Sequence, residues 1–120
     1  MAQDAKRPFD VFSGKCPSRE VLEHVTSKWG ALTLAALSVQ SARFGELRRS
    51  VDGISEKMLS QTLKALEADG LVDRRVQSTL PPHVDYALTP SGQTVAEAVQ
   101  ALIVSLYGVM PEVMRVREHV

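Results

Sequence analysis

The segment ISEKMLSQTLKALEADGL, residues 54–71, carries a row of polar side chains beside a row of leucines. Leu59, Leu63 and Leu66 follow one another at helical spacing and must point towards a core. The outward positions that we expect to contact nucleic acid are Ser55, Lys57, Ser60, Gln61 and Lys64. Glutamine can bond adenine through two atoms and lysine can donate to guanine acceptors. Ser55 is also suited to capping the helix, which partly occupies its hydroxyl.

Six further residues flank this helix and could contact the phosphate backbone of a duplex. They are Arg43, Arg48 and Arg49 before the helix, and Arg74, Arg75 and His83 after it. The alternative for each arginine, taken singly, is a solvated surface charge. Residues 43–75 contain seven Lys or Arg and six Asp or Glu, so their net charge is only +1. We therefore expect few phosphate contacts per subunit, and a need for two subunits.

The composition is that of an ordinary soluble globular protein with one domain. The chain has 120 residues, of which 44% are hydrophobic and 23% charged. Its net charge is zero, which counts against nucleic-acid binding unless the local field differs. The start, MAQDAKRPFD, has no apolar core and does not resemble a signal peptide. The apolar run ALIVSLYGVM is too short to span a bilayer, so we expect a cytoplasmic protein without a membrane partner.

Helical and strand periods follow one another along the chain. We expect a flexible N-terminal arm over residues 1–14 and one domain over residues 15–120. Apolar spacing predicts helices over about residues 17–26, 29–38, 43–51, 56–69 and 90–118. LVDRRVQ and HVDYALT, residues 71–77 and 83–89, alternate with a period of two and predict a β-hairpin. A helix-turn-helix followed by a hairpin is a winged helix, so the expected fold class is mainly α with a small antiparallel β-hairpin.

The last predicted helix, about residues 90–118, carries an apolar stripe that is longer than one small core needs. Val95, Val99, Leu102, Leu106, Val109, Val113 and Val116 are spaced alternately by four and three residues, which is typical of helix pairing. The alternative is a helix that covers its own core, which suits the first two. We expect dimerisation through the N- and C-terminal helices, with an interface of Val21, Leu22, Val99, Leu102, Ile103, Leu106, Val109, Met110 and Val113. Gly108 and Pro111 predict a bend or break.

Three stretches together resemble the HxlR family of bacterial transcription regulators. They are CPSREVLEHVTSKWGALTLAAL, RFGELRRSVDGISEKMLSQTLKALEADGLVDR and PPHVDYALTPSG, and the resemblance spans roughly residues 16–100. The family is related to the MarR type, and the resemblance implies a dimeric winged helix-turn-helix that binds DNA. Members commonly have glycine, arginine and arginine where this chain has Ser27, Thr62 and His83.

Cys16 is the single cysteine and precedes Pro17 at the start of the first predicted helix. The helix dipole and the neighbouring Lys15 and Arg19 favour thiolate over thiol, and a thiolate reacts with oxidants, quinones and aldehydes. Some HxlR regulators that this chain resembles sense such compounds through a cysteine at this place. Cys16 is therefore a candidate sensor, and the alternative is a small buried residue.

The sequence has no motif for catalysis, cofactor binding or metal binding. His24, His83 and His119 are dispersed, and Cys16 with His24 supplies at most two metal ligands. Walker, G-x-S-x-G and G-x-G-x-x-G patterns do not occur in the sequence. We therefore expect no enzyme activity, no cofactor and no metal.

These observations favour a homodimeric, sequence-specific regulator that binds double-stranded DNA at an inverted-repeat operator. We expect a repressor, because a bound dimer obstructs polymerase without an activating surface, and release by a small molecule or a thiol-reactive signal. One alternative is a winged-helix protein-interaction module that does not bind DNA, which the neutral charge, Thr62 and His83 favour. Another is a small-molecule receptor with a pocket between the last helix and the DNA-binding half.

Overall fold

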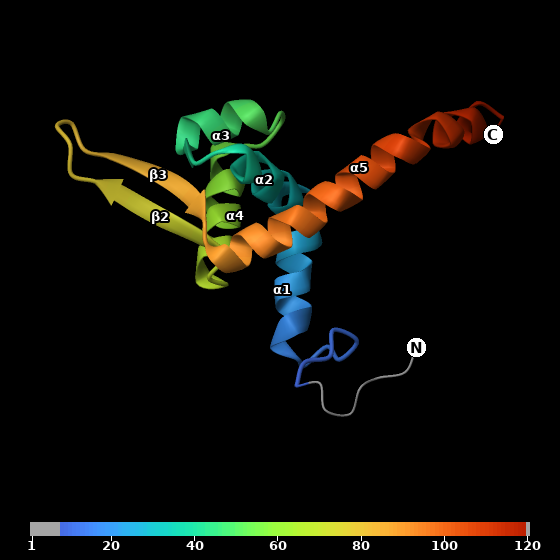
Figure 1. Cartoon of the computed structure of the whole chain (residues 1–120), viewed down its shortest axis with the longest axis horizontal. Coiled ribbons are helices and arrows are strands. Elements are labelled where there is room, and N and C mark those ends of the chain that lie inside the picture. Colours follow the sequence, from blue (N-terminus) through green and yellow to red (C-terminus); the bar gives the residue numbers. More distant parts are fainter. Residues whose placement is uncertain (1–7, 120) are drawn as a thin grey trace.

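The computed structural model describes residues 8–119, which form five helices and a three-stranded sheet (Figure 1). In chain order the elements are α1 (Pro17–Thr26), α2 (Lys28–Val39), β1 (Ala42–Arg43), α3 (Phe44–Ser50), α4 (Glu56–Ala68), β2 (Val72–Gln77), β3 (His83–Leu88) and α5 (Pro90–Glu118). The β2–β3 hairpin and the outer half of α5 extend from opposite sides of the body (Figure 1). The predicted winged helix-turn-helix class is confirmed. Residues 1–7 of the predicted arm lie outside the described residues.

Both ends of α4 are capped as the sequence predicts. The Ser55 hydroxyl accepts a hydrogen bond from the Met58 N–H at 3.0 Å and so satisfies one free donor at the start of the helix. At the other end Gly70 has a φ of +75°, its N–H donates to the Glu67 carbonyl, and the Leu71 N–H donates to the Leu66 carbonyl. These two bonds form a Schellman motif, which terminates the helix at a defined residue.

The inner face of α4 forms the centre of the core. Leu59, Leu63 and Leu66 are each at most 2% exposed, as the helical spacing predicts. They belong to one cluster with Leu34 of α2 and Leu47 of α3. Because burial of a leucine side chain is worth roughly 1.5–3 kcal/mol, these three positions determine which side of α4 faces the solvent.

The sheet has one more strand than the sequence predicts. β2 and β3 pair in antiparallel register, with Arg74 opposite Tyr86, and β1 pairs with the other edge of β3. The strand order is therefore β1-β3-β2. The extra strand consists of only Ala42 and Arg43, and two residues are too few to show an alternating pattern.

The start of α5 is fixed against the end of α4. The Thr89 hydroxyl accepts from the Gly92 N–H at 2.9 Å and donates to the Gly70 carbonyl at 2.6 Å, while the Thr89 N–H donates to the Leu71 carbonyl. Beyond this junction α5 continues as one helix through Pro111, so the expectation of a break there is wrong, and a bend there stays a prediction. Pro111 removes one internal hydrogen bond, and on this exposed turn water can satisfy the carbonyl that is left free.

The length of α5 corrects one expectation about membranes. Over an 18-residue window this 29-residue helix has a mean hydropathy of 1.4, so by length and composition alone it could cross a bilayer. The expectation considered only the apolar run ALIVSLYGVM, which is shorter than the helix that contains it. Near the start of α5, however, Ala96 and Val99 are buried in the core of the domain, which is equally typical of a helix in a water-soluble domain.

Gly92 provides a test of this junction. A Cβ at Gly92 would lie 1.8 Å from the Leu71 carbonyl oxygen, so Gly92→Ala should lower the free energy of unfolding by roughly 1–3 kcal/mol through overpacking. A Cβ at Gly108 in the same helix would meet no atom within 4 Å, so Gly108→Ala should raise it by about 0.5–1 kcal/mol. Urea unfolding at equal protein concentration measures both, and equal effects of the two changes would contradict the packing described.

Candidate nucleic-acid interface

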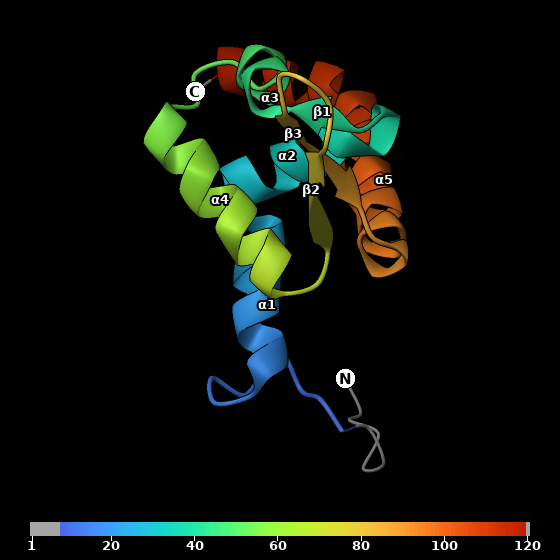
Figure 2. The same ribbon diagram turned by 90° about the vertical axis from the view of Figure 1, so that its left-hand side faces the viewer.

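The outward side of α4 carries Ser55, Lys57, Ser60, Gln61 and Lys64, which we call the polar face. All of these side chains are exposed except Ser60, which is half-buried. Within residues 8–119, Lys57, Ser60, Gln61 and Lys64 make no side-chain hydrogen bond or ion pair, whereas the Ser55 hydroxyl is engaged as the helix cap. α4 lies along the outside of the body between α1 and the hairpin (Figure 2). The structure thus presents four unpaired polar side chains along one helix.

The three arginines near α3 differ in how free they are. The Arg48 guanidinium donates to the Glu56 carboxylate at 2.9 Å, so a charge in the first turn of α4 compensates it. Arg43 and Arg49 are exposed, and within the described chain neither forms an ion pair. The Arg43 backbone N–H donates to Glu46, which caps α3. Of the three, Arg43 and Arg49 keep charges that an anion could pair.

The wing, which we define as β2, β3 and the loop of residues 78–82, does not bring its basic residues together. Arg74 lies opposite Tyr86 and Arg75 opposite Asp85 in the register. Because successive residues point to opposite sides of a strand, the two arginines lie on different faces of the wing. His83 is half-buried, with its Nδ1 atom 3.2 Å from the Thr79 hydroxyl. At most one of these arginines can therefore share a side with the polar face.

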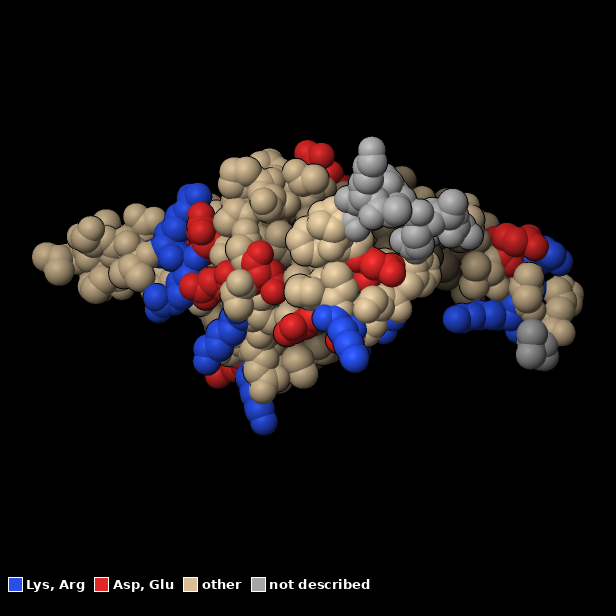
Figure 3. Space-filling model, turned by 90° about the horizontal axis from the view of Figure 1, so that it is seen from below, with Lys and Arg blue, Asp and Glu red and all other residues tan. Residues whose placement is uncertain are grey.

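The charge on this part of the molecule is mixed. Seen from below, Lys and Arg side chains gather at the base of the wing and alternate with Asp and Glu, and the tip carries neither (Figure 3). Leu80 at the tip is 97% exposed. This distribution agrees with the net charge of only +1 over residues 43–75. The side of the molecule that carries α4 and the wing is therefore not strongly positive.

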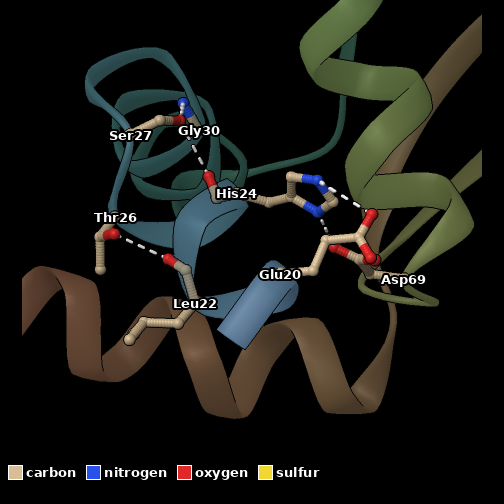
Figure 4. Close-up of polar contacts among 7 residues, drawn as sticks. All are labelled: Glu20, Leu22, His24, Thr26, Ser27, Gly30 and Asp69. Carbon is tan, nitrogen blue, oxygen red and sulfur yellow. Dashed lines mark hydrogen bonds and ion pairs between the residues drawn. The ribbon is translucent and has the colours of Figure 1, made fainter. Parts of the chain in front are cut away.

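One hydrogen bond that the sequence did not indicate joins α1 to the end of α4. The His24 Nδ1 atom lies 2.6 Å from Asp69 Oδ2, and its Nε2 atom lies 3.9 Å from Glu20 (Figure 4). His24 and Asp69 are 28% and 12% exposed and are 45 positions apart in the sequence. No local pattern reveals such a contact. It holds the first helix against the helix that carries the polar face.

A small groove of about 170 Å³ runs beside this contact, between α1 and α4. It is lined by His24, Ser27, Gln61, Thr62, Ala65 and Leu66. The family that this chain resembles commonly has arginine at the position of Thr62. Thr62 is half-buried and lies on the α1 side of α4 rather than on its polar face. The groove also places the α1–α2 junction beside Gln61.

A larger cavity of about 770 Å³ lies between α2, α3 and α5. Its wall is mostly apolar, with Ala36, Val39, Leu47 and Ile103, and Arg49 stands among its polar residues. The cavity lies between the last helix and the helix-turn-helix, where the alternative of a small-molecule receptor requires a pocket. Within residues 8–119 no group of three or more His, Cys, Asp or Glu side chains could hold a metal ion.

The residues predicted to form a dimer interface fall into two groups. Leu22, Leu102, Leu106, Val109 and Met110 are between 37% and 56% exposed, and Val113 is half-buried. Val21 and Ile103 are half-buried and pack against the core of their own chain. Val99 is only 6% exposed because the first turns of α5 cover α2, so it has little surface for a partner and is removed from the prediction.

Cys16 occupies the N-cap position of α1 and receives two hydrogen bonds at sulfur. The Ser18 hydroxyl donates to Sγ at 3.2 Å and the Asp10 N–H at 3.3 Å. These donors, Ser18 first, hold the pKa of the Cys16 thiol below its ordinary value. The sequence predicted that the helix dipole and the neighbouring cations would do so, but the Arg19 guanidinium donates to the carbonyls of Val11 and Phe12 instead. The pKa of Cys16 is lowered as predicted, chiefly by hydrogen bonds to sulfur.

Comparison with known proteins gives a consistent result. A family model described as HxlR-like helix-turn-helix matches residues 24–110. The uncharacterized HTH-type transcriptional regulator YtfH of Escherichia coli K12 is 51% identical over 109 residues, which are 91% of this chain and 86% of YtfH. The candidate transcriptional regulator ytfH from Salmonella typhimurium superposes with a TM-score of 0.84 at 49% identity, covering 92% of this chain and 98% of that one. The redox regulator HypR, in its oxidized form, has a TM-score of 0.71 at 33% identity, covering 78% and 96%.

Proposed function

The chain belongs to the HxlR-like helix-turn-helix family, and on this premise we propose that it is a cytoplasmic transcription regulator that binds double-stranded DNA as a homodimer. The similar proteins described above are named as transcriptional regulators. The observation that carries the proposal is the polar face of α4, whose Lys57, Gln61 and Lys64 are exposed and unpaired within the described chain. A helix with such a face fits the major groove, with its N-terminal part against base edges.

The position of each side chain indicates which part of the duplex it would contact. Gln61 and Lys57 contact base edges, and Lys64, further along the helix, contacts phosphate. Arg43 and Arg49 add phosphate contacts, as does whichever of Arg74 and Arg75 lies on the side of α4. Arg48 contributes less, because Glu56 already pairs with it. So few contacts per subunit require two subunits for firm binding, and a bound dimer would obstruct polymerase and repress.

Replacement of Gln61 tests this function. Gln61→Ala should weaken binding to an operator selected from random duplexes by about 1–3 kcal/mol, because a bidentate contact with a base is lost. Binding to random duplex should change little, since that binding depends on phosphates. Fluorescence anisotropy at two salt concentrations measures both, with Gln93→Ala on exposed α5 as the matched control. Absence of any duplex binding by the wild type at low salt would favour the protein-interaction alternative.

The proposed dimer uses the exposed apolar side of α5. Leu102, Leu106 and Val109 share one side of the helix at heptad spacing and are 56%, 50% and 51% exposed. A monomer would leave this stripe in water, whereas a second copy would bury it. A twofold axis through the pair presents the two α4 helices to half-sites about 34 Å apart in an inverted repeat.

A charge within the stripe should separate the subunits. Leu106→Asp is expected to convert a dimer to a monomer in sedimentation velocity and to weaken operator binding with it. Val104→Asp is the control, because Val104 is 64% exposed but lies on the opposite side of α5 from Leu102. A wild type that sediments as a monomer at micromolar concentration, or a Leu106→Asp variant that remains dimeric, would refute this interface.

We further propose that a thiol-reactive electrophile relieves repression through Cys16. The thiolate adds to a ring carbon of a quinone: an S–C bond forms as a ring C=C bond opens, the hydrogen of that carbon moves to one quinone oxygen and a proton from water goes to the other. The product is a hydroquinone thioether, so no separate oxidant is required. The adduct places a bulky group on the sulfur at the start of α1. α1 is bonded to the end of α4 through His24 and Asp69, so a displacement of α1 changes the position of the polar face. The likeness to the redox regulator HypR supports a sensing role.

Two substitutions test the sensor. Cys16→Ser should abolish both the adduct, seen by mass spectrometry, and DNA release by benzoquinone. Ser18→Ala removes the main donor to sulfur, which raises the pKa of Cys16 and slows adduct formation at neutral pH. At a pH well above the ordinary thiol value both proteins are ionised, so their rates should converge. If Cys16→Ser still releases DNA on addition of benzoquinone, the sensor proposal fails.

The 770 Å³ cavity favours a second candidate signal, an apolar small molecule that binds between α5 and the helix-turn-helix. Its volume lies in the range of small-molecule sites. Ile103 and Tyr107 of α5 line it, so an occupant would contact the proposed dimer helix directly.

A further inference from the structure

Lys28, the first residue of α2, belongs to none of the surfaces described so far. Its Nζ atom lies 4.2 Å from the centre of the Trp29 ring, which is a cation–π contact. Lys28 is exposed, and within residues 8–119 no carboxylate forms an ion pair with it. The ring therefore packs against the ammonium, which has no acidic partner within the described chain.

Contacts of the two neighbouring residues, Ser27 and Trp29, place Lys28 between the small groove and the turn that leads into α4. The Cη2 atom of Trp29 lies 3.7 Å from the position that a Cβ on Gly53 would take, and Gly53 is in the turn that leads into α4. Ser27, next to Lys28, lines the small groove together with Gln61. Lys28 thus lies on the part of the surface that runs from the helix-turn-helix turn to the middle of α4. The start of α2 is seen beside α4 in Figure 2.

The start of α2 is also electrostatically unbalanced. A helix N-terminus carries partial positive charge and is stabilised by acidic side chains. The first turn of α2 has no acidic residue and instead begins with a lysine. Two positive features therefore coincide at one point, which costs stability unless an anion lies against them. A phosphate of a duplex seated on α4 is such an anion.

We propose that Lys28 binds a backbone phosphate of the duplex at the flank of α4, and so acts as a positioning contact that carries no base specificity. This inference rests on the proposed function. Lys28 adds one cation per subunit to those of residues 43–75. The net charge of that region is only +1. Trp29 orders the lysine before binding, so less side-chain entropy is lost when the phosphate arrives.

The salt dependence of binding tests this role. Each neutralised phosphate contributes about 0.9 to the slope of log K against log salt concentration, so Lys28→Gln in a dimer should flatten the slope by about 1.8. Affinity should fall by the same factor for selected operator and random duplex. Lys28→Arg should keep the wild-type slope. Lys15→Gln is the matched control, because Lys15 is exposed but precedes α1, away from α4, and its slope should be unchanged.

The outcomes separate this inference from the function on which it rests. If the wild type binds with a salt-dependent affinity and Lys28→Gln has the same slope, Lys28 is not a phosphate contact and the function stands. If the wild type shows no salt-dependent binding, the proposed function itself fails. Thermal unfolding of Lys28→Gln should match or exceed the wild type, since a cation leaves a helix N-terminus. Trp29 is the single tryptophan, so its fluorescence should change when a phosphate binds the ammonium that lies on its ring.

Discussion

Burial of three leucines on one side of α4 is the constraint from which the rest of this structure follows. Leu59, Leu63 and Leu66 have almost no exposed surface and pack against helices that precede and follow α4 in the sequence. Rotation of α4 about its axis would expose them at a cost of several kcal/mol in total. The polar face is therefore directed outward by the core, and within the described chain only its Ser55 side chain makes a hydrogen bond. That arrangement leaves its hydrogen-bonding groups available for a ligand.

The position of α4 is held equally firmly at its far end. The Schellman motif at Gly70, the Thr89 bonds from α5 and the His24–Asp69 pair from α1 all converge within a few residues of the helix terminus. A helix secured there by two other helices moves with them. In the proposed regulator, a displacement of α1 near Cys16 or of the paired α5 helices would therefore move α4 and its DNA-contacting side chains.

Prediction from the sequence succeeded where the determinants are local. The leucine spacing and the Ser55 cap each depend on residues within one or two helical turns, and each is found in the structure. It failed where partners are distant or elements very short. β1 has two residues, and the donors that lower the pKa of Cys16 come partly from a loop whose course no period reveals.

The same distinction between local and distant determinants applies to the candidate nucleic-acid interface. The exposure of Lys57, Gln61 and Lys64 follows from the helical period, so the sequence could predict it. The compensation of Arg48 by Glu56, the burial of Val99 and the placement of Lys28 depend on how separate elements pack. The two wing arginines show the limit most clearly, because adjacent residues that look equivalent in a sequence lie on opposite faces of a strand.

Hydroxyl-radical footprinting on an operator selected from a random duplex pool tests most directly the claim that two outward α4 faces contact one duplex. The account predicts two groups of protected sugars on the same side of the duplex, centred about 34 Å apart, or one helical turn. A single protected patch, or protection that does not depend on the presence of Lys57 and Gln61, would contradict it.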